Sequence, residues 1–342
     1  MQTSPWPNGW IVRPARMDDV DRVLEMITAR WKAPYGENEP SRRGIESWWQ
    51  GPRFDLATDT RLVLDAENAV AGMASVANPG EPYSEFVPSA VVHPRYEGRT
   101  ELWDWLQGWG LRRARELVPL AVGGKRVVAS CRAPALDGAR RAALERAGFA
   151  VVRVANRMGT GLTAPSQAAQ WPASVSVRTA DIEADLEAIA GLYLETWRDQ
   201  RGFVEIPFDA VVAGFREDIE HEGAQFDPTL WFLAVEGNEL AGIALCSGHI
   251  ASDTTRGLVG ALGVSQAKRK RGIALALLQH AFAEFHRRGY AAVELDVDTE
   301  NATGALGVYE RAGMRVIRQS MRYERELRPD AGRATESRRR PG

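Results

Sequence analysis

The chain contains few of the residues that stabilise secreted or metal-binding proteins. Only two cysteines, Cys131 and Cys246, occur in 342 residues, too few and too far apart to suggest disulfides or a thiolate metal site. The five histidines show no spacing typical of zinc ligands, so we predict no metal. No run of about 18 apolar residues and no signal-peptide pattern is present. We therefore expect a cytoplasmic protein with no membrane partner.

An excess of charge of either sign is also missing. Charged residues make up 26% of the chain and hydrophobic residues 44%, and the formal net charge is −2. This is the composition of a soluble globular protein, and it predicts no nucleic-acid partner. Because 342 residues exceed one ordinary domain of about 100 to 200 residues, we expect two domains.

The two halves of the chain repeat one pattern. Arg13 and Arg178, each at the end of a predicted first strand, are 165 residues apart. Gly148 and Gly313, each after Glu-Arg-Ala, are also 165 residues apart. A constant offset at both ends indicates a duplicated unit, and a polar stretch with two prolines separates the copies. The predicted division is a first domain at 1–162, a linker at 163–174, a second domain at 175–327 and a disordered tail at 328–342.

Each half shows the same order of elements: strand, helices, hairpin, strand, helix, strand, helix and a last pair of strands. In the second half, two apolar runs at 231–235 and 240–245 flank a turn and predict a hairpin. An apolar stripe predicts a helix from Gly272 to Arg288, and alternation predicts a strand at 292–297. These features favour an α+β fold with a mixed, mostly antiparallel sheet flanked by helices. A Rossmann-like fold is the alternative, but no G-x-G-x-x-G follows a predicted strand.

The segment from Leu262 to Ala274 carries the clearest chemical signal, because a predicted strand runs through a basic loop directly into a helix. A helix N-terminus offers unpaired N–H groups and the positive end of the helix dipole, and Gly272 lets a phosphate come close. The lysines and arginines add attraction for a ligand with several phosphates, such as coenzyme A. The alternative is a solvated basic turn that precedes a helix.

This segment and a later one resemble a known family. Arg269–Ala274 (RKRGIA) resembles the R/Q-x-x-G-x-G/A signature of GNAT acyltransferases. Asn301 with Tyr309–Met314 (YERAGM) resembles the later N…Y-E-R-x-G-F segment of the family. The resemblance covers nearly all of residues 175–327. Within the family, the sequence of these segments is similar to that of the tandem-domain GNAT proteins of actinobacteria. It implies two tandem GNAT domains and acetyl-CoA as the co-substrate.

The resemblance also implies roles for individual residues. The backbone near Val264 would pair with the pantetheine arm and polarise the thioester carbonyl. Asn301 would hold the pantetheine, and Tyr309 would protonate the departing thiolate as a general acid, unless it is an ordinary core aromatic. The implied cofactor-binding residues are Leu262, Gly263, Val264, Arg269, Lys270, Arg271, Gly272, Ile273, Ala274, Asn301 and Tyr309.

The residue that removes the proton from the acceptor amine is left open. An amine is mostly protonated near neutral pH, so it must lose a proton before it attacks. No carboxylate lies on the strand at 257–264. The candidates are Glu205, Asp227, His249 or a chain of water molecules. His249 has the most suitable intrinsic pKa and is our predicted catalytic base.

The first half lacks these functional side chains at the matching positions. With Val92 matched to Val264, a carboxylate and a β-branched residue fall in the phosphate-binding loop, where they repel and crowd a pyrophosphate. We therefore predict that the first domain is a degenerate, inactive copy. The matched pairs are Glu97 for Arg269, Thr100 for Gly272, Leu144 for Tyr309 and Leu136 for Asn301.

The sequence thus predicts transfer of the acetyl group of acetyl-CoA to a primary amine of a small molecule, by direct attack in the second domain. One alternative is acetylation of a protein amine or a hydroxyl, since no motif marks the acceptor pocket. Another is a non-catalytic CoA-binding regulatory module, against which the presence of Tyr309 and Asn301 argues. Trp197 can be a pocket or a core residue. A monomer and a homodimer both remain open.

Overall fold

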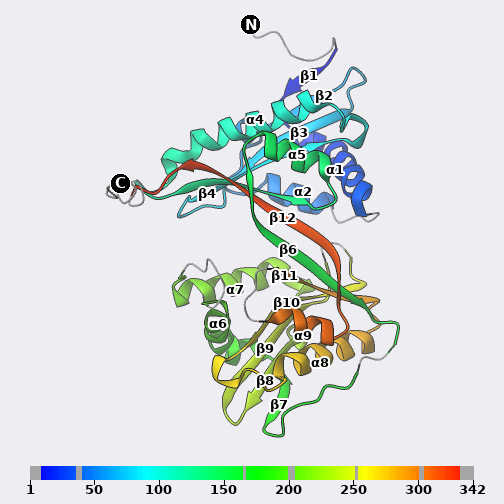
Figure 1. The fold of residues 1–342 in the computed structure, drawn as a ribbon, viewed down its shortest axis with the longest axis vertical. Coiled ribbons are helices and arrows are strands. Elements are labelled where there is room, and N and C mark those ends of the chain that lie inside the picture. Colours follow the sequence, from blue (N-terminus) through cyan, green and yellow to red (C-terminus); the bar gives the residue numbers. More distant parts are fainter. Residues whose placement is uncertain are drawn as a thin grey trace, which may run out of the picture. The chain divides into compact units, whose positions relative to one another are not determined.

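The chain forms two compact units, shown in Figure 1 for the computed structural model. The structure describes residues 9–35, 41–164, 167–198, 205–250, 253–299 and 304–331. Unit 1 takes in the residues up to Val154 and those from Ser320 onward, and unit 2 runs from Ala155 to Gln319. The predicted linker at 163–174 falls within unit 2. Residues 332–342 of the predicted tail lie outside the described residues.

Unit 1 is a mixed sheet with helices on both faces. Its strand order is β1-β2-β3-β4-β5-β12, in which β4 and β5 run parallel and the other neighbours antiparallel. The elements from the start of the described chain to the strand that continues into unit 2 are β1 (Ile11–Arg13), α1 (Val20–Tyr35), α2 (Arg42–Trp49), α3 (Leu56–Asp59), β2 (Thr60–Leu64), β3 (Val70–Ala77), β4 (Glu85–Val92), α4 (Thr100–Leu117), β5 (Val127–Pro134), α5 (Gly138–Arg146) and β6 (Ala150–Gly161).

Unit 2 repeats this plan with the strand order β6-β11-β10-β9-β8-β7. Here β10 and β11 form the parallel pair, and the other neighbours are antiparallel. The elements are β7 (Val175–Thr179), α6 (Ile182–Arg198), α7 (Phe208–Glu222), β8 (Trp231–Glu236), β9 (Glu239–Ser247), β10 (Arg256–Val264), α8 (Ile273–Arg287), β11 (Ala292–Asp298), α9 (Ala305–Arg311) and β12 (Arg315–Arg328).

The predicted α+β fold with a mixed sheet is confirmed. The predicted hairpin is β8 and β9, the helix predicted from Gly272 to Arg288 is α8, and the strand predicted at 292–297 is β11. These elements depend on local patterns of apolar residues and on glycines at their ends, which a sequence displays directly.

The last strand of each half serves both units. Residues Ala155–Gly161 of β6 pair with all of β11 in unit 2. Residues Ser320–Arg328 of β12 pair with β5 in unit 1. Each unit is therefore completed by a strand that the other half of the sequence encodes. The prediction of a last pair of strands within each half did not anticipate this exchange.

The sheet of unit 2 separates two apolar cores. On one face Phe282 and Phe285 of α8 pack on the sheet, and on the other Leu186 and Ile189 of α6 do so. The inner positions of β11, Val293, Leu295 and Val297, belong to the α8 core. Because side chains alternate along a strand, the acidic residues between them lie on the opposite face.

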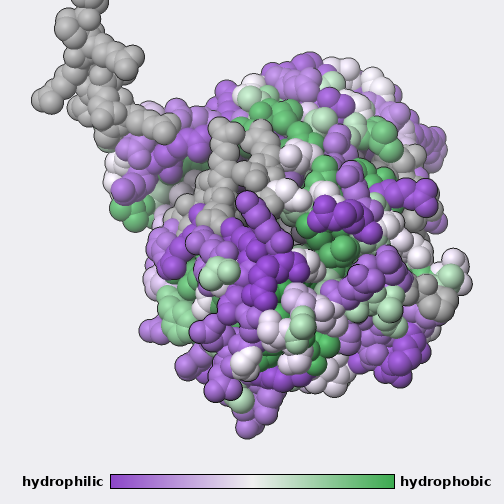
Figure 2. Space-filling model, turned by 60° about the horizontal axis from the view of Figure 1, so that its bottom comes forward, coloured by the Kyte–Doolittle hydropathy of each residue, from purple (hydrophilic) through white to green (hydrophobic). Residues whose placement is uncertain are grey.

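The surface visible in Figure 2 is mainly hydrophilic, and its hydrophobic residues are broken into small areas by polar ones. In the part of the chain that the structure describes, no helix combines the length and the apolar character needed to cross a membrane.

We predict that Gly257→Ala destabilises the protein by about 1 to 3 kcal/mol, because the new methyl group overpacks the core. A Cβ atom at Gly257 would lie 2.4 Å from the ring of Phe285, which is fully buried. The matched control is Gly161→Ala, where a Cβ atom meets no described residue within 4 Å. Urea denaturation measures both variants, and equal midpoints for them would contradict the packing described here.

Candidate functional site

A cavity begins where two parallel strands separate. β10 and β11 pair only through Arg256–Leu258 and Ala292–Glu294, although the strands continue to Val264 and Asp298. The register between β10 and β9 also shifts by one residue at Gly260, which marks a β-bulge. A bulge bends its strand, so β10 turns away from β11 and leaves a wedge.

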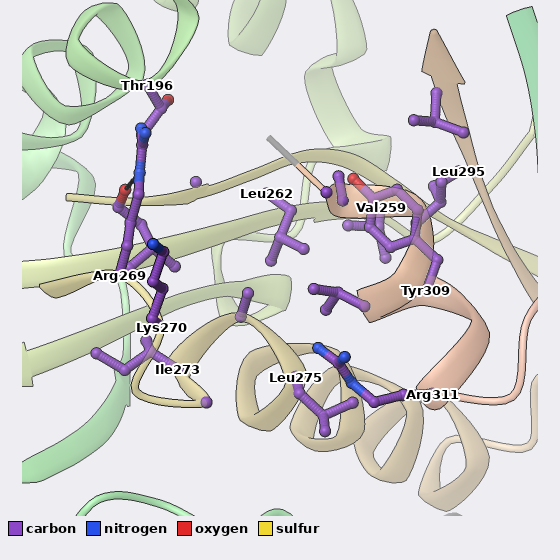
Figure 3. Close-up of a pocket in the computed structure, with 18 of the residues that line it drawn as sticks. Thr196, Val259, Leu262, Arg269, Lys270, Ile273, Leu275, Leu295, Tyr309 and Arg311 are labelled. Carbon is purple, nitrogen blue, oxygen red and sulfur yellow. Dashed lines mark hydrogen bonds between the residues drawn. The ribbon is translucent and has the colours of Figure 1, made fainter. Parts of the chain in front are cut away.

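A cavity of about 610 Å³ fills this wedge. Figure 3 shows Tyr309 close to Val259 and Leu295 at one end and Arg269 with Lys270 at the other, with Leu262 between them. The volume lies in the range typical of small-molecule sites. Its labelled residues give the cavity a basic end at Arg269 and Lys270 and an apolar end at Tyr309.

The start of α8 forms an anion-binding site at the basic end. Gly272 caps the helix with a φ of +87°, and its carbonyl accepts the first helical bond from Ala276 N at 3.0 Å. The N–H groups of the first turn before Ala276 have no partner within the helix and point outward from its N-terminus. Since Gly272 lines the cavity and has no side chain, a phosphate can approach these donors.

Three basic side chains of the loop line the cavity: Lys268, Arg269 and Lys270. Arg269 Nε donates to the carbonyl of Val264 at 3.2 Å, which fixes the guanidinium against the end of β10. Arg271 differs from the prediction, because it is not among the lining residues and binds Glu236 instead.

Tyr309 lines the apolar end of the cavity and is only 7% exposed. Burial raises the pKa of its hydroxyl to about 12. The hydroxyl is therefore protonated at any ordinary pH and can donate a hydrogen bond or a proton. The ring also packs in the α8 core, as the core interpretation predicts, and the role of Tyr309 as a general acid stays a prediction.

The three candidate bases lie away from the cavity lining. Glu205 pairs with Arg198 on the surface, and Asp227 binds Thr229 and Arg288. His249 follows β9, with its Nε2 atom 4.0 Å from a carboxylate oxygen of Glu222. Among the described residues, neither ring nitrogen of His249 has a hydrogen-bond partner. Its role as the base stays a prediction.

Two carboxylates and Thr196 line the cavity without having been predicted from the sequence, whereas Trp197, for which a pocket and a core position were both open, does line it. Asp296 and Asp298 lie on β11, and Thr196 and Trp197 lie at the end of α6. The signal for the carboxylates was present, because acidic residues alternate with apolar ones in the strand predicted at 292–297. The search for a base considered the neighbouring strand β10 instead.

Most of the predicted cofactor-binding residues meet in this one cavity. Asn301 lies outside the described residues. The predicted residues that line the cavity are Leu262, Gly263, Val264, Arg269, Lys270, Gly272, Ile273, Ala274 and Tyr309.

Comparison with known proteins gives consistent results. Residues 186–314 match the Acetyltransferase (GNAT) family. A mycothiol acetyltransferase of Thermobispora bispora is 29% identical over 259 residues, which is 74% of this chain and 79% of that protein.

Two solved structures are similar over nearly the whole chain. A GCN5-related N-acetyltransferase from Sphaerobacter thermophilus has a TM-score of 0.79 and 29% identity, covering 94% of this chain and 97% of that one. A tandem GNAT protein from the clavulanic acid biosynthesis pathway has a TM-score of 0.65 and 16% identity, covering 94% and 99%, and shows the shared tandem fold. The family match spans the strand, loop and helices that enclose the cavity, so residues 186–314 form a domain of the GNAT acetyltransferase family.

Proposed function

We propose that the chain transfers the acetyl group of acetyl-CoA to a primary amine of a small molecule, and that the reaction takes place in the cavity of unit 2. The observation that carries the proposal is the order of groups along this cavity. A phosphate-binding helix start lies at one end, an unpaired strand edge runs along the middle, and a buried phenol lies at the other end. An acyl-CoA has its phosphates, amides and sulfur in the same order.

The cavity suits acetyl-CoA, which is the co-substrate of the GNAT family. The first N–H groups of α8, with Lys268, Arg269 and Lys270, would hold the phosphates. The edge of β10 beyond Leu258 has backbone groups that β11 does not pair, and these would bind the pantetheine amides.

The residues of the cavity can promote direct attack by the amine. A backbone N–H near Val264 would stabilise the negative charge that develops on the carbonyl oxygen. Tyr309 would donate its proton to the sulfur as the C–S bond breaks. The pKa of Tyr309, about 12, exceeds that of an ordinary thiol, about 8.5. The proton transfer therefore requires that burial in the cavity also raises the pKa of the departing thiol, because burial disfavours the charged thiolate.

Asp296 is better placed than His249 to take the proton of the amine. Asp296 is among the residues that line the cavity, whereas His249 is not. Arg157 Nε donates to Asp296 at 2.9 Å and so fixes the position of the carboxylate. We infer that Asp296 attracts the protonated amine and accepts its proton, directly or through water.

A small-molecule acceptor is supported by the likeness to the mycothiol acetyltransferase, whose name describes a small thiol. Acetylation of a protein amine or of a hydroxyl remains the alternative that an acceptor screen would reveal.

We also propose that unit 1 does not bind acetyl-CoA. β4 and β5 separate after Phe86 and Ala129, as β10 and β11 do, but the register between β3 and β4 shows no bulge. The loop that follows β4 is one residue shorter, and the carbonyl that accepts the first helical bond of α4 belongs to Arg99. Arg99, rather than Thr100 as the sequence match suggested, therefore takes the place of Gly272.

Charged side chains of unit 1 occupy the corresponding region. Arg30, which is buried, donates to Asp137 at 2.9 Å and to Glu97 at 2.7 Å. Arg140 of α5 reaches Ser89 of β4 at 3.4 Å. Arg30 thus binds Asp137 and Glu97, and Glu97 keeps a carboxylate in the loop before α4, where it would repel a phosphate.

We predict that acetyl-CoA binds one site per chain and that Gly272→Glu abolishes this binding. The substitution adds a carboxylate beside the phosphates and disfavours the φ of +87°. Gly289→Glu is the matched control, because Gly289 has a φ of +85° and free space near the far end of α8. Isothermal titration calorimetry measures both variants. Two sites, or binding that survives Gly272→Glu, would mean that unit 1 holds acetyl-CoA.

We predict that Tyr309→Phe lowers kcat by a factor of about 10² to 10⁴, the usual contribution of a general acid, and leaves the Kd of acetyl-CoA nearly unchanged. Because the pKa of Tyr309 is raised to about 12, its ionisation should not limit the activity of the wild type below that pH. Thiol release against a panel of amines, recorded across pH, measures both effects. A variant with full kcat would show that Tyr309 is only a packing residue.

We predict that Asp296→Asn lowers kcat/KM for the amine by about 10² or more, as loss of a general base does, whereas His249→Gln changes it little. Both substitutions keep the size of the side chain. The same thiol-release assay, run at varied amine concentration, measures both variants. The reverse result, with loss only in His249→Gln, would restore His249 as the base.

A further inference from the structure

The loop that would bind the phosphates is hydrogen-bonded near both of its ends to carboxylates of other elements. We call residues 265–272 the phosphate loop. At its start, Glu195 of α6 accepts hydrogen bonds from Gln266 N at 2.6 Å and from Ser265 Oγ at 3.0 Å. This contact fixes the beginning of the loop to α6.

At the other end, Glu236 bridges two cations of the loop. The carboxylate, at the end of β8, accepts from Lys268 Nζ at 2.7 Å and from the two terminal nitrogens of Arg271 at 2.6 and 2.9 Å. Ser174 also donates to it. The side chain of Glu236 is only 18% exposed, and the hydrogen bonds from Arg271 and Lys268 hold its pKa far below the usual range.

Between these two cations the backbone adopts an unfavourable conformation. Lys270 has a φ of +62°, in the left-handed region that residues with a Cβ atom avoid. Such a conformation persists only where the surrounding contacts impose it. Lys268 and Arg271 flank it and share one carboxylate, so their bridge is the contact that can impose it here.

A carboxylate beside a phosphate-binding loop would by its charge alone weaken the binding of an anion. Its presence needs another advantage, and a loop already ordered in its binding form loses less entropy when the ligand arrives.

We propose that Glu236 is a positioning residue that keeps the phosphate loop in its binding conformation before acetyl-CoA enters. The inference rests on the proposed function, since it assumes that this loop binds the phosphates of acetyl-CoA. It assigns a role to a residue outside the signature and outside the cavity lining.

The test compares Glu236→Gln with Glu239→Gln by acetyl-CoA calorimetry and steady-state kinetics. Glu239 is 75% exposed and pairs with Lys268 at 3.1 Å without bridging to Arg271. Both variants lose the same charge in the same region. If the bridge orders the loop, Glu236→Gln raises the Kd and KM of acetyl-CoA on the order of tenfold, while kcat at saturation is kept. Glu239→Gln then binds as tightly as the wild type or more tightly.

Two further variants distinguish a loss of order in the phosphate loop from a general loss of structure. Arg271→Gln removes the other side of the bridge and should weaken binding to a similar degree. Lys270→Gly removes the strain of the positive φ together with one cation of the loop, so it serves as a second background. In that background Glu236→Gln should raise the Kd of acetyl-CoA by a smaller factor than it does in the wild type, because glycine adopts a positive φ without the bridge.

The inference is overturned if Glu236→Gln leaves binding unchanged or tightens it as Glu239→Gln does, or if it weakens binding as much in the Lys270→Gly background as in the wild type. A wild-type protein that fails to bind acetyl-CoA would instead overturn the proposed function, and the inference with it.

Discussion

Hydrogen bonding between β10 and β11 ends after Leu258 and Glu294, and the site of unit 2 depends on that ending. Had the two strands paired to their ends, the edge of β10 would be saturated and no cavity would exist beside α8. The bulge at Gly260 bends β10 where the strands separate and does not interrupt its pairing with β9. The helix start, the basic loop and Tyr309 are then the walls of a space that the sheet itself opens.

Both units have a wedge between parallel strands, and we propose that only the wedge of unit 2 makes a site. In unit 1 the strands also separate, yet Arg30, Asp137 and Glu97 form ion pairs there and Arg140 reaches across to Ser89. In unit 2 the corresponding loop carries basic residues, and a glycine begins the helix. The units thus share the order of their strands and differ in the bulge, in the length of the loop and in a few side chains.

The sequence predicts what local patterns determine. The hairpin of β8 and β9, the helix α8 and the phosphate loop follow from apolar periodicity and from Gly272, so the sequence alone is enough to place them. The direction of Arg271 could not be predicted, because it depends on Glu236, which is far away in sequence. Asp296 was missed because its position in the cavity depends on how β11 lies beside β10. The exchange of β6 and β12 could not be predicted either, since both halves carry the same pattern and either pairing would bury it.

That exchange affects the order in which the protein can fold during synthesis. Unit 1 comprises most of the first half, yet the strand that covers the edge of β5 is residues 320–328, near the end of the chain. A ribosome therefore releases a nearly complete N-terminal sheet whose edge has no partner until residues 320–328 emerge. Exposed strand edges recruit other strands, so the nascent chain has a long interval in which association with a neighbouring chain competes with its own completion.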